Sequence, residues 1–229
     1  MKAIINRCLK ALNLAQFNKL NAPLEVGELQ LTPPIERQYV LRCLVKQPFK
    51  DFAIPDFLEW CRPMIEMAVE NQTKLGLIQP FCYVTVRHGA VDSVSDDEWH
   101  VDGFSMNITH LPEQNYIWCS HTPTEYITKK LDIPSDFNPF KHNLHLYIQD
   151  NITAEDKIKR LRPNTVNCVD TYVIHRRPAV TQGMQRTFVR LSFTPIEIND
   201  VNNTINPLID TRYTRDGKKE FRDKLERYR

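Results

Sequence analysis

The spacing of apolar side chains changes near residue 80, from a helical period to strict alternation. In residues 1–20 and 56–75, apolar positions recur every three or four residues, which is typical of helices that pack through one face. Pro34 favours a further helix over residues 35–45, because proline suits the first turn of a helix. Residues 1–80 are therefore predicted to form a mainly helical support region.

From residue 81 onward, short segments alternate between apolar and polar side chains. The predicted strands are 81–89, 115–120, 143–150, 165–175 and 186–198. Residues 123–131 and 154–162 are expected to be short helical segments, and 201–229 a linker followed by a charged C-terminal helix. The strands and helices do not alternate regularly, which favours an antiparallel barrel or sandwich over a parallel sheet. The predicted fold class is α+β, with a strand-rich core over residues 81–200.

The composition indicates the class of protein but not a binding partner. The 229 residues are 41% hydrophobic and 25% charged, which is ordinary for a globular domain. The net charge of +2 gives no strong signal for nucleic acid, and no apolar run is long enough to cross a membrane. We expect no signal peptide at the N-terminus. Six cysteines without a CxxC pair favour reduced thiols in a cytoplasmic protein over disulfides or a zinc site.

Candidate chemistry begins at the segment WHVDGF, where His100 and Asp102 are two positions apart. In a strand these two side chains project from the same face. His175, 73 residues after Asp102 (175 − 102), could complete a set of two histidines and one carboxylate. That set occupies one face of an octahedral metal and leaves positions open, as in non-haem Fe(II) oxygenases. We therefore predict that His100, Asp102 and His175 are metal ligands and form the catalytic centre.

A row of polar side chains follows His175 in the segment RTFVRLSF. Arg186, Arg190 and Ser192 share one face of this predicted strand. Burying two cations is costly unless an anion accompanies them. A hairpin that turns near residues 181–183 would place His175 roughly across from Arg190. A dicarboxylate would fit such a cavity, with one end on the metal and the other in a two-point contact with a guanidinium.

His100-x-Asp102, the distal His175 and an arginine 11 or 15 residues later resemble the Fe(II)/2-oxoglutarate-dependent dioxygenase superfamily. The resemblance covers residues 81–198 and implies a double-stranded β-helix, the jelly-roll fold that cupins share. It also implies Fe(II), 2-oxoglutarate as co-substrate and O₂ as oxidant. The implied reaction couples oxidative decarboxylation of 2-oxoglutarate, giving succinate and CO₂, to oxidation of a substrate C–H bond, most simply hydroxylation. The carboxylate of Asp102 argues against a halogenase.

Two arginines compete for the distal carboxylate of the co-substrate in this resemblance. Arg186, 11 residues after His175, has the spacing of taurine-dioxygenase-like members. Arg190 with Ser192 resembles the Arg-x-Ser signature of plant and antibiotic-pathway members, and we favour it slightly. Tyr83 and the nearby Arg87, on the preceding predicted strand, are further candidates to hydrogen-bond the co-substrate.

Two other functions are compatible with the sequence. One is a non-catalytic cupin-like domain that binds a metal or ligand, although such a domain has no use for the arginine row. The other is a phosphate- or nucleotide-binding module built from Arg176, Arg177, Arg186 and Arg190. The substrate is expected to be a small molecule or a protein side chain, with specificity set by residues 91–98 and 132–143 and by the N-terminal region. His145 is a further candidate to face the pocket.

Overall fold

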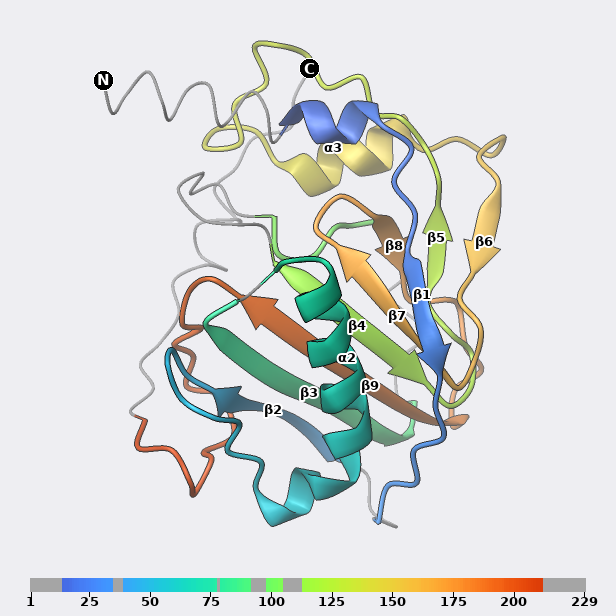
Figure 1. The fold of residues 1–229 in the computed structure, drawn as a ribbon. Helices are drawn as coiled ribbons and strands as arrows, with labels where there is room; N and C mark the ends of the chain where they lie inside the picture. Colours follow the sequence, from blue (N-terminus) through green and yellow to red (C-terminus); the bar gives the residue numbers. More distant parts are fainter. Residues whose placement is uncertain (1–13, 35–38, 78, 92–97, 105–112, 212–229) are drawn as a thin grey trace, which may run out of the picture.

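The computed structural model describes residues 14–34, 39–77, 79–91, 98–104 and 113–211 (Figure 1). Among these residues no helix has the length and apolar character needed to cross a membrane. In chain order the elements are η1 (Gln16–Asn18), β1 (Leu24–Glu28), β2 (Tyr39–Lys46), η2 (Asp56–Cys61), α2 (Arg62–Lys74), β3 (Phe81–Ala90), β4 (Gln114–Cys119), β5 (Glu125–Ile127), α3 (Leu144–Asn151), β6 (Ile158–Arg160), β7 (Thr165–Asp170), β8 (Ile174–Arg176) and β9 (Gln185–Thr194).

The strands form two antiparallel sheets. The larger sheet has six strands in the order β1-β7-β4-β9-β3-β2, and the smaller has three in the order β6-β5-β8. Helix α2 lies across one face of the larger sheet, and α3 lies beyond the ends of its strands (Figure 1). The fold is thus mostly antiparallel β-structure with few helices, which agrees with the predicted barrel or sandwich.

The period-two pattern of β3 and β9 gives the larger sheet two different faces. Val84, Val86, Val189 and Leu191 are fully buried and join the apolar cluster that includes α2. The alternate side chains of the same strands point to the other face. That second face is polar and carries the arginines, so the apolar side holds the sheet against α2 while the polar side remains available for chemistry.

A second apolar cluster supports the smaller sheet and the segment that carries His100. It contains Trp99 and Val101 on either side of that histidine, together with Ile148 of α3 and Ile174 of β8. The buried side chains alternate with the polar ones, so packing of Trp99 and Val101 fixes the direction in which His100 and Asp102 project.

The described part of residues 1–80 is not mainly helical, contrary to the prediction. The predicted helix over residues 35–45 is wrong, because Tyr39–Lys46 forms strand β2 and pairs with β3 along its length. β1 also joins the larger sheet, so residue 80 is not a structural boundary. The helix predicted within 56–75 is confirmed as η2 and α2. Residues 1–13, where another helix was predicted, lie outside the described residues.

Three elements in the predicted core have a different structure. The strand predicted at 143–150 is helix α3: Asn143 accepts hydrogen bonds from the backbone of His145 and Leu146 at 2.9 and 3.3 Å. This cap starts a helix that buries Leu144, Tyr147 and Ile148 at helical spacing. The helical segments predicted at 123–131 and 154–162 instead contain strands β5 and β6, which pair with each other.

The predicted hairpin between His175 and Arg190 does not form, because β8 and β9 belong to different sheets. The predicted linker after residue 200 is partly packed: the buried Asn206 side chain donates to the carbonyls of Leu44 and Ala53 at 2.7 and 2.8 Å. The charged C-terminal helix predicted after it lies outside the described residues.

Candidate metal centre

The three predicted metal ligands converge on one point. His100 and His175 form an antiparallel bridge in which each backbone amide donates to the carbonyl of the other residue at 3.0 Å. Their ring centroids are 4.6 Å apart. One ligand atom each from His100, Asp102 and His175 lies within 4.8 Å of the other two, which is close enough for a single ion to contact all three. The structure thus brings the three predicted ligands together, and their role as metal ligands stays a prediction.

Hydrogen bonds to the backbone set the orientation of both imidazoles. Nδ1 of His100 lies 2.8 Å from the carbonyl of Glu98, and Nδ1 of His175 lies 2.9 Å from the carbonyl of Val173. A carbonyl only accepts hydrogen bonds, so Nδ1 carries the proton in each ring. The lone pair of each neutral ring is therefore on Nε2. Metal-binding histidines use this arrangement, in which the second nitrogen fixes tautomer and ring orientation.

The backbone around Asp102 is fixed from two sides. The hydroxyl of Thr171, in the turn between β7 and β8, donates to the carbonyl of Asp102 at 2.9 Å. Gly103 follows with φ of +70°, and a Cβ at this position would overlap the side chain of Glu113. Glycine is thus required there both by its conformation and by the space available. These constraints hold the carboxylate beside the two histidines.

Positive groups surround the carboxylate of Asp102. Nη1 of Arg190 donates to its Oδ2, and Nε2 of His175 lies 3.5 Å from the same oxygen. Burial raises the pKa of Asp102, but the charge of Arg190, then a hydrogen bond from His175 and the charges that His175 and His100 carry when protonated, outweigh burial and hold the pKa well below its usual value. The Asp102 charge in turn raises the pKa of Arg190. Asp102 is therefore a carboxylate at neutral pH, the form that binds a metal.

The donor set fits a divalent transition metal. Two imidazole nitrogens and one carboxylate oxygen suit iron and similar ions, and a triad on one side of the ion leaves the remaining positions for other ligands. His100 and Asp102 are partly exposed while His175 is buried, so the site is anchored in the protein and open on one side.

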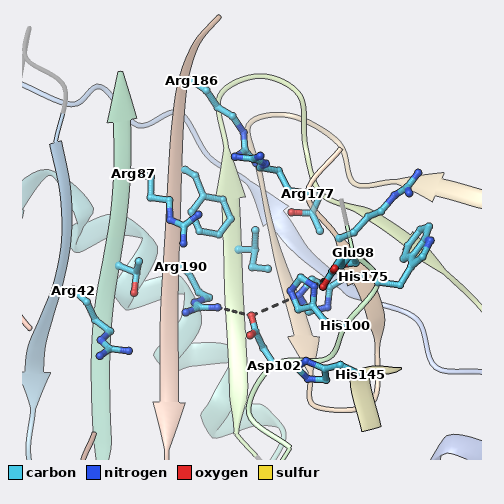
Figure 2. Close-up of a pocket in the computed structure, with 16 residues that line it drawn as sticks. Arg42, Arg87, Glu98, His100, Asp102, His145, His175, Arg177, Arg186 and Arg190 are labelled. Atoms are coloured by element: carbon cyan, nitrogen blue, oxygen red, sulfur yellow. Dashed lines mark hydrogen bonds and ion pairs between the residues drawn. The ribbon is translucent and has the colours of Figure 1, made fainter. Parts of the chain in front are cut away.

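The open side faces a cavity of about 540 Å³ between the two sheets (Figure 2). One wall consists of residues of the larger sheet, among them Thr85, Arg87, Ile117 and Phe188. The opposite wall includes His175, Arg176 and Arg177. Six arginines line it: Arg42, Arg87, Arg176, Arg177, Arg186 and Arg190. The only carboxylates among the lining residues, all of them from the described chain, are Glu98 and Asp102.

The structure separates the two arginines that compete for the co-substrate. Arg190 is occupied by Asp102. Arg186 is 8% exposed, with Nη2 3.2 Å from the sulfur of Cys119 and its guanidinium 5.2 Å from the ring centre of Phe188. Its buried Nε has no hydrogen-bond partner, and the same is true of the Nε of Arg190, so the two differ in that no carboxylate of the described residues pairs with Arg186. A buried guanidinium with an unsatisfied donor is the kind of group that an anionic ligand satisfies.

Two other predicted co-substrate residues do not line the cavity. Ser192 donates to the side-chain oxygen of Asn115 at 2.6 Å, and the hydroxyl of Tyr83 accepts from the backbone of Ile198 at 2.8 Å. Ser192 and Tyr83 are register partners on β9 and β3. Both share a sheet face with Arg190 but form the next pair along the two strands on that face. There, other groups of the protein already form hydrogen bonds with their hydroxyls. Their assignment to the co-substrate is therefore corrected.

Several lining residues had no role in the sequence prediction. Arg42 was missed because its strand was predicted to be a helix, although alternating side chains in YVLRCLVK could have revealed it. Thr85 and Thr124 were not selected, because a threonine in a strand carries no signal of its own. His145 does line the cavity, but it does so from helix α3, with its ring 6.1 Å from that of His100.

Comparison with known proteins gives distant structural likenesses. No protein-family model matches the chain, and no curated protein matches it. The solved structures it resembles include AviO1 from Streptomyces viridochromogenes Tue57, with 14% identity, 85% of each chain covered and a TM-score of 0.39. A 2OG-Fe(II) oxygenase family oxidoreductase from Burkholderia pseudomallei has 12% identity, 72% of each chain covered and a TM-score of 0.37.

EvdO2 from Micromonospora carbonacea var. aurantiaca, complexed with 2-oxoglutarate, is another structure that the chain resembles. It has 12% identity and a TM-score of 0.39, and the match covers 81% of this chain and 83% of that one. Identities and TM-scores this low carry no functional conclusion, so function is inferred from the site alone.

Proposed function

We propose that this protein is an Fe(II)- and 2-oxoglutarate-dependent dioxygenase that hydroxylates a substrate. The observation that carries the proposal is the convergence of His100, Asp102 and His175 in a cavity that also contains the buried guanidinium of Arg186. A metal triad and an unsatisfied cation in one cavity match the two ends of a keto-dicarboxylate. A double-stranded β-helix is the fold we assign, supported by the two antiparallel sheets that enclose the cavity.

Each residue has a distinct task in this proposal. His100, Asp102 and His175 hold the iron, which, when bound with 2-oxoglutarate, activates O₂ for C–H oxidation. Arg186 binds the distal carboxylate of the co-substrate. It replaces Arg190, which the sequence analysis favoured slightly, because Arg190 is paired with Asp102. Ile117 and Phe188 supply the apolar part of the wall, which excludes water from the reacting groups.

The cysteines support a reducing compartment, and we propose the cytoplasm. Cys43, Cys61, Cys82, Cys119 and Cys168 are all buried free thiols in the described chain. Burial raises the pKa of Cys43 to about 12, which keeps this thiol protonated and unreactive at neutral pH.

The proposal is tested by measuring succinate. Purified protein supplied with Fe(II), O₂ and 2-oxoglutarate should form succinate, slowly without substrate and faster with it. His175→Ala should abolish both succinate formation and tight Fe(II) binding. His121→Ala is the matched control, because its ring bonds only to Ser120 among the described contacts and does not line the cavity.

The alternative function, a non-catalytic cupin-like domain, predicts a different result. Such a domain would bind the metal through the same triad but form no succinate under any condition. Metal binding without binding of 2-oxoglutarate would favour that alternative and reject the dioxygenase. Absence of metal binding would reject both.

A further inference from the structure

Four side chains form a row across the smaller sheet and end beside the metal centre. Arg160 on β6 is the register partner of Glu125 on β5, and Glu125 is the register partner of Arg176 on β8. The antiparallel bridge between the two histidines then makes Arg176 and Trp99 the next pair along it. The row therefore links a surface arginine, through a buried carboxylate, to the residue that precedes a candidate metal ligand.

The carboxylate of Glu125 is shared between two arginines. Its side chain is 5% exposed, and each of its oxygens pairs with a different guanidinium. Oε1 accepts from Nε and Nη2 of Arg160 at 2.9 and 2.7 Å, and Oε2 accepts from Nε of Arg176 at 2.8 Å. A buried carboxylate is stable only when such partners compensate its charge. Glu125 thus holds the Arg176 guanidinium in a defined direction.

The guanidinium of Arg176 lies over the ring of Trp99. Its Cζ is 4.3 Å from the ring centre, well within the range of a cation–π contact, and a planar guanidinium can stack on the indole face. Trp99 is buried in the apolar cluster that supports the smaller sheet, and its carbonyl accepts from Nε2 of Gln149 on α3 at 2.9 Å. The apolar cluster, α3 and Arg176 together fix the position of the residue before His100.

The bridge that carries the two imidazoles is held differently on its two sides. On one side the next pair is Val101 and Ile174, and both are buried in the apolar cluster. On the other side the pair is Trp99 and Arg176, and both line the open cavity. A charged side chain at that place cannot be fixed by apolar packing alone, so the contacts with Glu125 and with the indole face fix it instead.

We infer that Arg176, held by Glu125, is a positioning residue for the metal centre. It stacks on Trp99 and thereby fixes the direction in which His100 projects. A ligand side chain that is already oriented loses little conformational freedom when the ion binds, which favours binding. This inference rests on the proposed function, because it takes His100 and His175 as metal ligands.

The charge of Arg176 alone would have the opposite effect on metal binding. The side chain lines the cavity beside the triad, and a cation there repels a divalent ion. If Arg176 acted only through its charge, its removal would tighten metal binding. If it acts by holding Trp99, its removal weakens binding, because His100 must then be ordered when the ion binds. The sign of the change in affinity therefore separates the two roles.

The experiment is a calorimetric titration of Mn(II) into the full metal-free chain, without co-substrate, for the wild type and its variants. Arg176→Gln should weaken Mn(II) binding about tenfold, the lower end of the effect of changing groups that orient metal ligands. Trp99→Leu, which keeps an apolar side chain but no aromatic face, should weaken binding to a similar extent. Trp99→Phe keeps a face for the guanidinium and should stay within about threefold of the wild type.

Two further measurements distinguish positioning from a general loss of stability. The absorption bands of bound Co(II), which report ligand geometry, should shift in Arg176→Gln and Trp99→Leu and stay unchanged in Trp99→Phe. The double variant, Arg176→Gln with Trp99→Leu, should bind Mn(II) within about twofold of the weaker single variant, because both changes remove one and the same contact.

Arg160→Gln is the matched control, because it removes the same charge and a partner of the same carboxylate. Arg160 is 66% exposed and lies on β6, with β5 between it and Arg176. This variant should leave Mn(II) affinity and the Co(II) spectrum unchanged. Arg176→Gln leaves Glu125 paired with Arg160, so the buried carboxylate keeps a partner and the variant should fold, which urea denaturation verifies.

Unchanged or tighter Mn(II) binding in Arg176→Gln would overturn the inference. An equal loss in Arg160→Gln, or losses that simply add in the double variant, would also overturn it. All three results leave the dioxygenase proposal intact, since the wild type still binds the metal. If the wild type binds no Mn(II), the proposed metal centre is rejected and the inference with it. If Mn(II) binds but no succinate forms, turnover is rejected, and the variants still decide the role of Arg176.

Discussion

Replacing each of two neighbouring arginines on β9 separates their roles. Arg186→Ala removes a buried guanidinium whose Nε has no protein partner. Arg190→Ala removes the partner of Asp102. We expect the first change to weaken 2-oxoglutarate binding and the second to affect mainly the metal site and stability.

The magnitudes follow from the contacts. A two-point guanidinium–carboxylate contact built from charged hydrogen bonds should contribute about 3 kcal/mol. At 1.4 kcal/mol per tenfold change, Arg186→Ala should therefore weaken 2-oxoglutarate binding about 100-fold. Arg186→Lys keeps the charge but not the planar pair of donors, and it should lose about tenfold.

Arg190→Ala should change 2-oxoglutarate affinity less than about fivefold. It should instead lower the free energy of unfolding of the metal-free protein by about 2–3 kcal/mol, because Asp102 loses its cationic partner. Bound metal should restore part of that loss, since a ligand that binds only the folded state stabilises it.

The assay is calorimetric titration of 2-oxoglutarate into anaerobic Mn(II)-loaded protein, with urea denaturation of each metal-free variant. Equal affinities in Arg186→Ala and Arg190→Ala would contradict the assignment of Arg186. A larger loss in Arg190→Ala would show that the ion pair with Asp102 opens to admit the co-substrate.

Two further predictions concern the supports of the site. Gly103→Ala should lower the free energy of unfolding by about 2–4 kcal/mol in urea denaturation, because φ is +70° and Glu113 occupies the Cβ position. Gly76→Ala, at φ +66° with open space around it, should cost only about 1 kcal/mol. The amide of Asn202 and then the guanidinium of Arg42 lower the pKa of Asp200. The contact should therefore stabilise the fold above about pH 4 and be lost as pH falls through the lowered pKa, so wild type and Asp200→Asn should converge in urea midpoint at low pH.

The candidate metal ligands could be chosen from residue types and their spacing in the sequence, without knowledge of the fold. His100 and Asp102 needed only an extended segment between them, which Trp99 and Val101 supply by packing on either side of His100. His175 could be chosen because of the arginine row that follows it. Its structural partner was predicted incorrectly: His175 pairs with His100 across a bridge and not with Arg190 in a hairpin.

The pattern of apolar and polar residues gave a wrong prediction where the same pattern is compatible with both a strand and a helix. The alternating segment 143–150 fits a strand, but the Asn143 cap decides for a helix. Strand β2 was missed because Pro34 was taken as the start of a helix, although Tyr39, Val40 and Val45 favour a strand and the segment pairs with β3. The choice between Arg186 and Arg190 depended on where the Asp102 carboxylate points, which is a tertiary fact that no spacing along the chain reveals.

The bridge between His100 and His175 has a consequence for how the apoprotein behaves. Two residues 75 positions apart in sequence (175 − 100) are joined by a reciprocal pair of backbone hydrogen bonds, so these bonds hold the two imidazoles together independently of any ion. An incoming ion then closes no loop and orders no segment at this point. Binding should accordingly be rapid and leave the peptide backbone where it was, and an iron-depleted preparation should regain its centre on simple addition of metal, without refolding.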